Sequence, residues 1–284
     1  MSARNYRSEL IGLFGYPVDE NATVVIMEAA FAALNLNYRY NTTRVYPEDL
    51  PVAIAALKAF HMKGTHITIP HKVEVLKYLD YVSETAALMG AVNTIYLKDG
   101  ETYGENTDGK GFLTSLIDAG VPLAGQRAVV LGAGGAARAM TVELAAAGVA
   151  HITIVNRSRE RGEALVELLN SKTSVTAEYA AWDGAYRVPP TSNILVNATS
   201  IGMYPDPNKP NIDYGALLPD MIVCDGVHNP VKTPFLKEVA GSGCRTLDGF
   251  SMLVNQGAIS FKLWTGLDAP VEVMKRALAA EFGV

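Results

Sequence analysis

The sequence predicts an α/β protein with a mainly parallel sheet. Short apolar runs alternate with longer helix-like patterns along most of the 284 residues, which is typical of parallel strands covered by helices on both faces. Apolar residues make up 49% of the chain, enough to bury a large core. A glycine turn between a strand candidate and a helical pattern favours the same class, and the length allows two domains.

The N-terminal third contains the first set of alternating elements. The sequence predicts a strand at 10–14, a helix at 24–34, an extended segment at 38–45, a helix at 47–60, a strand at 66–69 and a helix from 70 onwards. Pro47, followed by Glu48 and Asp49, suits the positively polarised start of a helix. Asp99-Gly100 predicts a hairpin between the flanking apolar runs.

The rest of the chain contains a second set of elements. The strand candidates are 128–131, 151–155, 193–196 and 221–225, with helical patterns between several of them. Segment 171–190 is expected to be irregular and on the surface. Helical runs at 252–265 and 271–282 end the chain, and the sequence leaves open whether they return to the N-terminal part.

A glycine turn after strand 128–131 predicts dinucleotide binding. It consists of Gly132, Ala133, Gly134, Gly135 and Ala136, and a helical run follows. Gly132 allows the tight turn, Gly134 lets the backbone approach a pyrophosphate, and small residues let the helix pack on the strand. Free N–H groups at the helix start would face the phosphates.

The end of the next strand favours NADP as the cofactor. Asn156 stands where an NAD site usually has an acidic residue, and Arg157, Ser158 and Arg161 follow. A guanidinium suits a 2′-phosphate, whereas a carboxylate would repel it. NAD remains the alternative. The competing interpretation is a solvated basic helix start, and Arg159 is expected to lie on the surface.

Composition limits the partners. The net charge is −5 and no long basic run occurs, which argues against nucleic acid or anionic membrane. No apolar run approaches the ~20 residues of a membrane span, and two cysteines do not make a disulfide framework. No ligand spacing supports a metal site. We therefore expect a cytoplasmic protein with a small-molecule substrate and no metal, and a homodimer is compatible with the sequence.

Two residues are candidates for proton transfer. Lys72 follows the strand at 66–69, and Asp108 stands immediately before a helical pattern. A dehydrogenase needs a group that exchanges a proton with the alcohol as the hydride moves, and these two side chains are the best candidates in the sequence. On spacing alone, the preferred interpretation is an exposed helix residue for Lys72 and an N-cap for Asp108.

Several motifs in one order resemble the shikimate dehydrogenase family over nearly the whole chain. Besides the glycine turn they are GTHITIPHK at 64–72, GAVNT at 90–94, NTD at 106–108, NRS at 156–158, NATSIGM at 197–203, NP at 229–230 and GFSMLVNQ at 249–256. The resemblance implies a Rossmann-like NADP domain (109–248) inserted in an α/β substrate domain (1–108 and 249–284). It also implies reversible oxidation of a ring hydroxyl of shikimate or quinate, as in aromatic amino acid biosynthesis.

The resemblance also assigns roles to residues. It implies Lys72 as the acid/base group with Asp108 as its partner. The implied substrate ligands are Asn21, Thr23, His66, Thr68, Asn93, His228 and Gln256. The implied cofactor ligands beyond the glycine turn and the basic strand end are Thr199, Met203, Gly226, Gly249 and Met252. Core packing is a nearly equal explanation for Met252.

The chain departs from the family at one end of the expected substrate. The family holds the substrate carboxylate with two serines spaced Ser-x-Ser, and the aligned residues here are Asn21 and Thr23. Asp19 and Glu20 stand next to them, and a carboxylate ~4 Å from a substrate carboxylate costs about 4 kcal/mol at an effective dielectric constant near 20. Either these side chains turn outward or the substrate has no anion there.

Two histidines are further departures from the family pattern. His66 replaces a family asparagine and His228 a family tyrosine. They are either cations that bind an anion in place of the serines or hydrogen-bonded polar groups. The pattern favours a paralogue that takes quinate or a cyclic polyol without a carboxylate. A redox-inactive NADP-binding sensor is a further alternative, against which the intact Lys72 and Asp108 argue.

Overall fold

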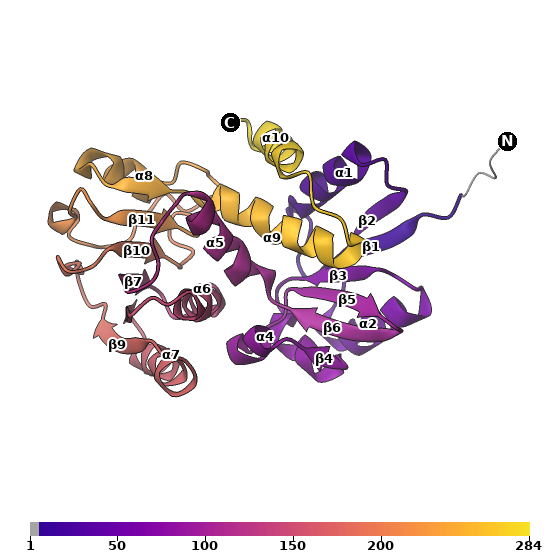
Figure 1. Cartoon of the computed structure of the whole chain (residues 1–284), viewed down its shortest axis with the longest axis horizontal. Helices are drawn as coiled ribbons and strands as arrows, with labels where there is room; N and C mark the ends of the chain where they lie inside the picture. Colours follow the sequence, from indigo (N-terminus) through magenta and orange to yellow (C-terminus); the bar gives the residue numbers. More distant parts are fainter. Residues whose placement is uncertain (1–5) are drawn as a thin grey trace. The chain divides into compact units, whose positions relative to one another are not determined.

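The computed structural model describes residues 6–284, so the first five residues of the expected substrate domain lie outside the described residues. The chain divides into two compact units, which Figure 1 displays with their elements labelled. Unit 1 comprises Met1–Thr107 and Val254–Val284, and unit 2 comprises Asp108–Leu253. The sequence placed the divisions at 108/109 and 248/249, so Asp108, Gly249 and Met252 fall in unit 2 instead of the substrate domain.

Unit 1 contains a six-stranded sheet in the order β2-β1-β3-β5-β6-β4. Its elements up to residue 105 are β1 (Glu9–Gly15), α1 (Thr23–Ala33), β2 (Tyr38–Arg44), α2 (Leu50–Ala59), β3 (Gly64–Ile67), α3 (His71–Glu74), β4 (Tyr81–Val82), α4 (Glu84–Met89), β5 (Thr94–Lys98) and β6 (Glu101–Glu105), with 3-10 turns at Pro47–Asp49 and Val75–Tyr78. The first three strands are parallel, and β5 runs antiparallel to β3 and β6. The alternating elements predicted for this part of the chain are confirmed.

Local sequence explains two of these elements. Leu50, Ile54 and Leu57 follow a helical spacing, and all three are buried in one core cluster, which is why α2 forms and packs on its apolar face. The predicted hairpin between β5 and β6 turns at Asp99 (φ 54°) and Gly100 (φ 83°). Positive φ at both central residues is the geometry that matches the twist of two paired strands, and Asp-Gly is well suited to it.

The C-terminal helices complete unit 1. They are α9 (Gly249–Thr265) and α10 (Val271–Phe282), and α10 packs beside α1 (Figure 1). The indole N–H of Trp264, on α9, donates to the backbone oxygen of Ile95 on β5, 2.8 Å away. The tail therefore returns to the N-terminal part of the chain, a point that the sequence left open.

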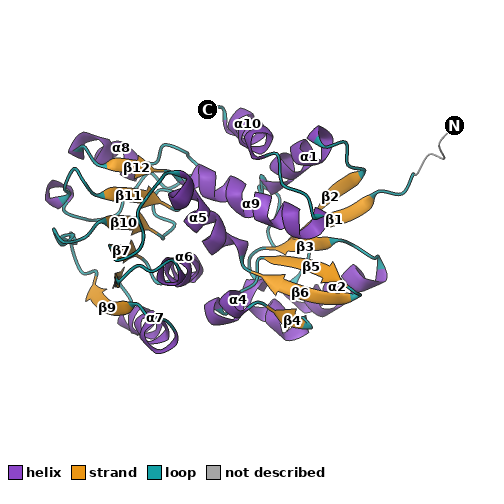
Figure 2. Ribbon diagram, in the orientation of Figure 1, coloured by secondary structure: helices purple, strands orange, loops and turns teal. Residues whose placement is uncertain are grey.

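Unit 2 contains a second six-stranded sheet, and its strand pairs are all parallel. Its elements are α5 (Thr107–Asp118), β7 (Arg127–Leu131), α6 (Gly135–Ala146), β8 (His151–Asn156), α7 (Arg159–Lys172), β9 (Thr176–Ala181), β10 (Ile194–Asn197), β11 (Ile222–Asp225), α8 (Pro234–Val239) and β12 (Arg245–Leu247), with 3-10 turns at Tyr214–Ala216 and Ala240–Ser242. The order β12-β11-β10-β7-β8-β9 is that of a doubly wound dinucleotide-binding sheet, with its switch point between β7 and β10. The α/β class and the Rossmann-like domain are confirmed, and Figure 2 distinguishes the strands of each sheet from the helices beside them.

One expectation about this unit is wrong. Segment 171–190 was expected to be irregular, but β9 lies within it and pairs in parallel with β8 along its whole length. Its sequence, Thr-Ala-Glu-Tyr-Ala-Ala, has weak strand propensity and few large apolar side chains. Because β9 is the edge strand, pairing with one neighbour suffices to form it, and this pairing is a tertiary effect that local sequence does not reveal.

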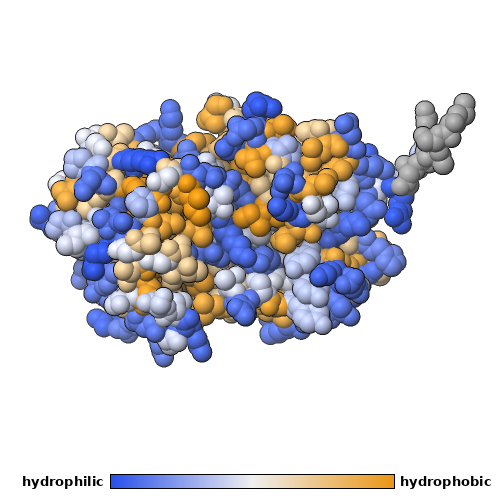
Figure 3. All heavy atoms as spheres, in the orientation of Figure 1, coloured by the Kyte–Doolittle hydropathy of each residue, from blue (hydrophilic) through white to orange (hydrophobic). Residues whose placement is uncertain are grey.

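The surface of the described residues is mixed. Figure 3 shows hydrophilic side chains over much of the visible face, with apolar side chains in groups between them. Exposed large apolar side chains include Val52 and Phe60. Among residues 6–284, no helix has both the length and the apolar character that crossing a bilayer requires.

The contact between β3 and α9 generates a stability prediction. A Cβ at Gly64 would lie only 2.0 Å from the Ile95 oxygen and 2.3 Å from Trp264 Nε1. We expect Gly64→Ala to lower the free energy of unfolding by about 3 kcal/mol or more, because backbone and indole must both shift. Urea unfolding followed by circular dichroism measures the change.

The matched control is Gly100→Ala in the same unit. A Cβ there meets nothing within 4 Å, although φ is +83°. We expect a loss of about 1 kcal/mol from the left-handed backbone alone. Equal losses for the two variants would contradict the packing argument.

Candidate active site

The glycine turn has the geometry of a phosphate-binding loop. Gly132 has a φ of 110°, and its N–H donates to the Val155 oxygen, 2.8 Å away, which fixes the turn between β7 and α6. Gly134 is the N-cap of α6 and has no side chain to block the helix start. Ala137, in the first turn of α6, is fully buried, so a small residue is needed for close packing.

The start of α6 has room for a ligand. Gly134, Gly135 and Ala136 are exposed, and a Cβ at either glycine would meet no atom within 4 Å. Ala133 is half-buried beside them. An open helix start with unhindered backbone N–H groups fits a pyrophosphate, and a bound NADP would contact the turn here.

The basic strand end is arranged around Ser158. The Asn156 amide donates to the Ser158 oxygen (2.8 Å), and Ser158 Oγ accepts from the Arg161 N–H (3.4 Å) as the N-cap of α7. Arg157 and Arg161 are both exposed, so their guanidinium groups are accessible to a 2′-phosphate. Arg159 pairs with Glu163 at 2.8 Å and lies over the Tyr179 ring, which agrees with its expected surface role.

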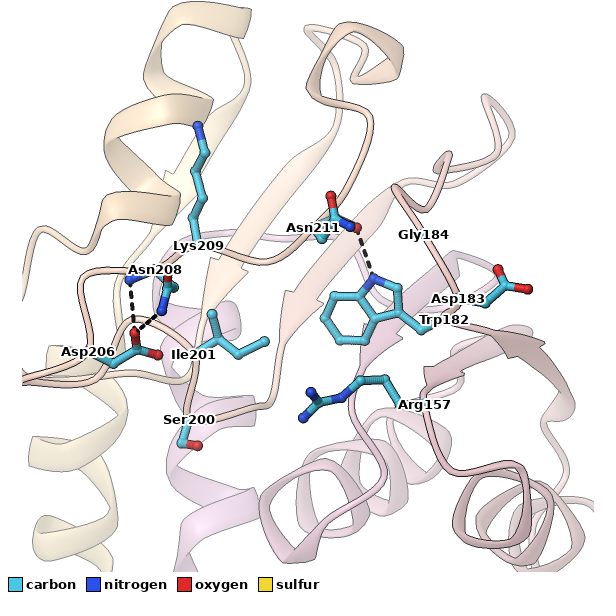
Figure 4. A pocket seen from close by; sticks show the side chains of 10 residues that line it. All are labelled: Arg157, Trp182, Asp183, Gly184, Ser200, Ile201, Asp206, Asn208, Lys209 and Asn211. Carbon is cyan, nitrogen blue, oxygen red and sulfur yellow. Dashed lines mark hydrogen bonds between the residues drawn. The ribbon is translucent and has the colours of Figure 1, made fainter.

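A cavity of about 680 Å³ opens beside Arg157 in unit 2, and Figure 4 shows the guanidinium pointing towards the space between Trp182 and Ile201. The other lining residues are Asp183, Gly184, Ser200, Asp206, Asn208, Lys209 and Asn211. Of the lining residues, only Arg157 was predicted as a ligand, although Ser200 and Ile201 stand in the motif at 197–203. Trp182 and Ser200 follow the ends of β9 and β10, so an assignment of β9 would have located part of this cavity.

A buried polar cluster positions the loops after β10 and β11. Asn197 Oδ1 accepts from the Thr199 hydroxyl (2.6 Å), and its amide donates to Asp225 Oδ1 (2.9 Å). Asp225 also accepts from the Thr233 hydroxyl (2.6 Å) and the Val227 N–H (3.0 Å), while burial raises the pKa of its carboxyl. These bonds fix the loop that carries Thr199 after the end of β10, the side of the sheet at which a Rossmann domain holds its cofactor.

The remaining residues implied for the cofactor have mixed environments. Met203 is exposed and Met252 is half-buried on α9. Gly226 and Gly249 have a packing reason for being glycine. A Cβ at Gly226 would lie 2.8 Å from Met140 Cε, and one at Gly249 would lie 2.5 Å from the Val227 oxygen.

Lys72 in unit 1 is placed by a short anchored helix. The Thr68 N–H donates to the Phe14 oxygen (3.0 Å) and begins the turn into α3. His71 is buried, and its Nε2 lies 2.8 Å from the Val45 oxygen, to which it donates. The Lys72 oxygen accepts from the Val92 N–H (2.8 Å), and the side chain is half-buried. Two backbone bonds and one side-chain bond, to three different strands or loops, thus hold Lys72 in place.

Asn93 and Gln256 meet in one buried network. Asn93 Oδ1 accepts from the Thr107 N–H at 2.7 Å, and the Thr107 hydroxyl lies 3.4 Å from Gln256 Oε1. Asn93 and Gln256 are 3% and 5% exposed, so water competes little with these bonds. Thr94, Thr107 and Ser260 belong to the same network. Thr94 and Thr107 stand in two of the sequence motifs, but no role was predicted for any of the three residues.

The side chains before α1 form local contacts. Asn21 Oδ1 accepts from the Thr23 N–H (3.0 Å), so the side chain stabilises the helix start. Asp19 is 65% exposed and forms a bidentate pair with Arg44 (2.8 and 3.0 Å). Glu20 is exposed as well. Asp19, Asn21 and Arg44 nevertheless line the same cavity, so the Asp19 carboxylate stays beside Asn21 with its charge paired to Arg44.

The two histidines differ from each other. His66 is buried, and both ring nitrogens are hydrogen-bonded within unit 1, to Tyr40 and Ser260. His228 is half-buried in unit 2, where burial lowers the pKa of its ring and the charge of Asp108 partly offsets the effect. The neutral ring favours a polar group over an anion-binding cation at His228. In the described part of the chain, no group of three His, Cys, Asp or Glu side chains could hold a metal ion.

The lowered pKa of His228 generates a prediction. Its unfolded-state pKa is about 6.5, so the unfolded chain binds more protons when the pH falls below that value. Folding stability due to His228 is therefore lost as the pH falls from about 6.5 towards the lower folded-state pKa. We expect His228→Gln to remove this loss and to gain stability relative to wild type as the pH falls from 7.5 to 5.

Urea unfolding of both proteins across that pH range measures the difference. All other titrating groups are common to the pair and cancel in the comparison. A difference that stays constant with pH would show that His228 titrates normally in the folded protein.

Family models match three parts of the chain. The shikimate dehydrogenase substrate binding domain matches residues 13–95, the shikimate / quinate 5-dehydrogenase model matches residues 116–202, and the shikimate 5'-dehydrogenase C-terminal domain matches residues 249–279. The three matches follow one another in the order that the sequence motifs predict.

Relatives and solved structures agree with these models. The chain is 44% identical over 275 residues to a shikimate dehydrogenase (NADP(+)) of Symbiobacterium thermophilum, covering 95% of this chain and 94% of the relative. It is 44% identical to the structure of a 5-ketofructose reductase of Gluconobacter, with a TM-score of 0.95 and coverage of 98% and 100%. A shikimate dehydrogenase in complex with NADP+ is 38% identical, with a TM-score of 0.92 and coverage of 99% and 98%. The chain therefore belongs to the shikimate dehydrogenase family of oxidoreductases.

Proposed function

We propose that this chain is an NADP-dependent dehydrogenase that interconverts a ring hydroxyl and a ketone of shikimate, 3-dehydroshikimate or a related cyclic polyol. The observation that carries the proposal is the joint presence of Lys72, Asp108 and the buried Asn93–Gln256 network. The family relatives named as NADP(+) enzymes support the same reaction. A redox-inactive sensor would have no need for the proton-transfer pair.

Each residue has a proposed part in the reaction. When the alcohol is oxidised, its carbon loses a hydride to NADP+, its oxygen loses a proton and the carbonyl bond forms. Lys72, as the neutral amine, takes that proton and becomes the ammonium, and in the reverse reaction the ammonium returns the proton to the carbonyl oxygen. The family resemblance gives Asp108 as the partner of Lys72 in this step. Asn93 and Gln256 hold other ring hydroxyls and so keep the reacting carbon in line.

NADP preference is supported by the basic strand end. Asn156 adds no negative charge there, and Arg157 and Arg161 are exposed. The relatives that carry NADP in their names support the same preference. The bound cofactor would supply or accept the hydride, and the exposed glycine turn would hold its pyrophosphate.

A second candidate substrate is a polyol or sugar ketone without a carboxylate. The specific observation is that Asn21 and Thr23 replace the serine pair and that Asn21 Oδ1 is engaged by the Thr23 N–H. The Gluconobacter structure at 44% identity is named for 5-ketofructose, which is a neutral sugar. A neutral substrate needs no charged hydrogen bonds at this position.

The location of the protein is also a proposal. We infer a cytoplasmic enzyme, which Cys224 and Cys244 support because both are free thiols. Cys224 is buried, and burial raises the pKa of its thiol to about 12, so it is unreactive.

The first functional prediction concerns proton transfer. Lys72→Met should lower kcat/KM by about 10²- to 10⁴-fold, because a positioned acid/base group contributes that much. Binding of NADPH, measured by its fluorescence, should stay unchanged. Lys77→Met is the matched control, since Lys77 is exposed and paired with Glu74, and it should keep full activity. A decrease in kcat/KM of less than about tenfold for Lys72→Met would contradict the proposed role of Lys72.

The second functional prediction concerns the substrate. Steady-state rates with shikimate, quinate and a neutral ring analogue, followed as NADPH absorbance, separate the two candidates. If the replacement of the serine pair by Asn21 and Thr23 decides specificity, kcat/KM for the neutral analogue should exceed that for shikimate by about tenfold or more. This factor corresponds to the loss of one hydrogen bond to a charged group. Efficient turnover of shikimate with a low Michaelis constant would reject the neutral-substrate candidate and leave the first.

A further inference from the structure

A chain of buried hydrogen bonds in unit 1 begins at Tyr40. The Tyr40 hydroxyl lies 2.6 Å from His66 Nδ1, and His66 Nε2 lies 2.9 Å from Ser260 Oγ. The three residues come from β2, β3 and α9 and are 5%, 3% and 0% exposed. The Trp264 and His66 rings form a T-shaped pair with their centroids 4.7 Å apart.

The bonds continue from Ser260 to the proposed substrate ligands. Ser260 Oγ lies 2.9 Å from Thr94 Oγ1 and 3.2 Å from Thr107 Oγ1. Both threonine hydroxyls reach Asn93 Oδ1, at 3.1 and 3.2 Å, and Thr107 also reaches Gln256. His66 is therefore connected to Asn93 and Gln256 through two intervening hydroxyl groups.

The donors between Tyr40 and Ser260 have one direction. The Tyr40 phenol is buried, and burial raises its pKa well above the ordinary value, so its proton needs an acceptor. In residues 6–284, the acceptor that lies within reach is His66 Nδ1. Nδ1 must then be unprotonated, so the neutral ring carries its proton on Nε2 and donates to Ser260 Oγ.

The hydrogen bond that Ser260 Oγ accepts from His66 determines which of its neighbours can receive the Ser260 proton. Because Ser260 Oγ accepts from His66, its own proton is available to the Gln256 backbone oxygen, 3.0 Å away. Its second lone pair can accept from a threonine hydroxyl. Asn93 Oδ1 accepts from the Thr107 N–H (2.7 Å), and the Asn93 amide nitrogen donates to Thr107 Oγ1 (3.0 Å), so both ends of this amide are bound in the network. A loss of the His66 donor would change the partners of Ser260 Oγ and, through the threonine hydroxyls, those of Asn93.

We propose that His66 is a positioning residue that acts through Ser260 to orient Asn93 and Gln256, and that it does not itself bind the substrate. The proposal rests on the proposed function, in which these two side chains hold ring hydroxyls. It also accounts for a histidine where the family motif has asparagine. Only a side chain that reaches both Tyr40 and Ser260 completes the chain of bonds in this protein.

Two variants of His66 that differ in side-chain length distinguish a positioning role from a merely structural one. A glutamine amide lies one carbon further from the backbone than an asparagine amide. His66→Gln can therefore place an N–H near Ser260, whereas His66→Asn reaches only the position of Nδ1 near Tyr40. Tyr40→Phe removes the first donor, and Tyr38→Phe on the same strand is the matched control outside the network.

The kinetic arm uses the ring substrate that wild type turns over. We expect His66→Asn to raise the KM for that substrate about tenfold, the effect of one misplaced hydrogen bond, with the KM for NADPH unchanged. His66→Gln should stay within about threefold of wild type. Tyr38→Phe should match wild type. Equal increases for His66→Asn and His66→Gln would overturn the proposal.

The spectroscopic arm needs no turnover, so it decides the inference even if the proposed function fails. In ¹⁵N-labelled protein, His66 should appear as the neutral Nε2–H tautomer between pH 6 and 8. The side-chain amide signals of Asn93 and Gln256 should shift in His66→Asn and stay near wild type in His66→Gln. An Nδ1–H tautomer, or amide signals that ignore His66→Asn, would overturn the proposal, whereas absence of turnover with these signals intact would count against the proposed function alone.

Discussion

The hydrogen bond from the Thr107 backbone N–H to Asn93 Oδ1, 2.7 Å long, is the contact on which the substrate side of this protein depends. Thr107 is where the first segment of unit 1 ends, and Asn93 directly precedes β5. Ser260 and Gln256 on α9 join the same cluster from a segment about 150 residues later in the chain. These polar groups are buried, so a group that loses its hydrogen-bond partner destabilises the fold by its desolvation cost. The same hydrogen bonds therefore join the separate segments of unit 1 and orient the proposed substrate ligands.

Unit 2 depends on backbone geometry instead. Gly132 turns the chain at a positive φ, and the parallel order of the sheet brings the ends of β7 and β10 together at the switch point. Side chains contribute one buried cluster, in which Asp225 ties the loops after β10 and β11. Burial raises the pKa of Asp225, so the folded state tolerates its charge only through the donors around it. A nucleotide site of this kind can therefore be read from local sequence more readily than the substrate site.

Charge around the start of α1 connects the fold to substrate choice. Asp19, which would repel a substrate carboxylate, is paired with Arg44. Asn21, which replaces one of the serines that bind this carboxylate in the family, is hydrogen-bonded at the start of α1. Glu28 on α1 accepts from the Tyr40 N–H at 2.7 Å. The Tyr40 hydroxyl lies 2.6 Å from His66, which is one of the departures from the family pattern. This departure therefore belongs to a connected set of contacts in one part of unit 1.

The sequence by itself determined the α/β class, the Rossmann-like order of elements, the glycine turn and the hairpin at Asp99-Gly100, because each depends on local periodicity or on backbone freedom at named residues. It also indicated the family through motifs in a fixed order. Tertiary structure alone decided three matters. It paired the weak strand β9 with β8, returned α9 and α10 to unit 1, and joined Tyr40, His66, Ser260 and Thr107 into one network. The physical reason is the same for all three: pairing partners distant in sequence satisfy each other's hydrogen bonds, and no local pattern records which partners will meet.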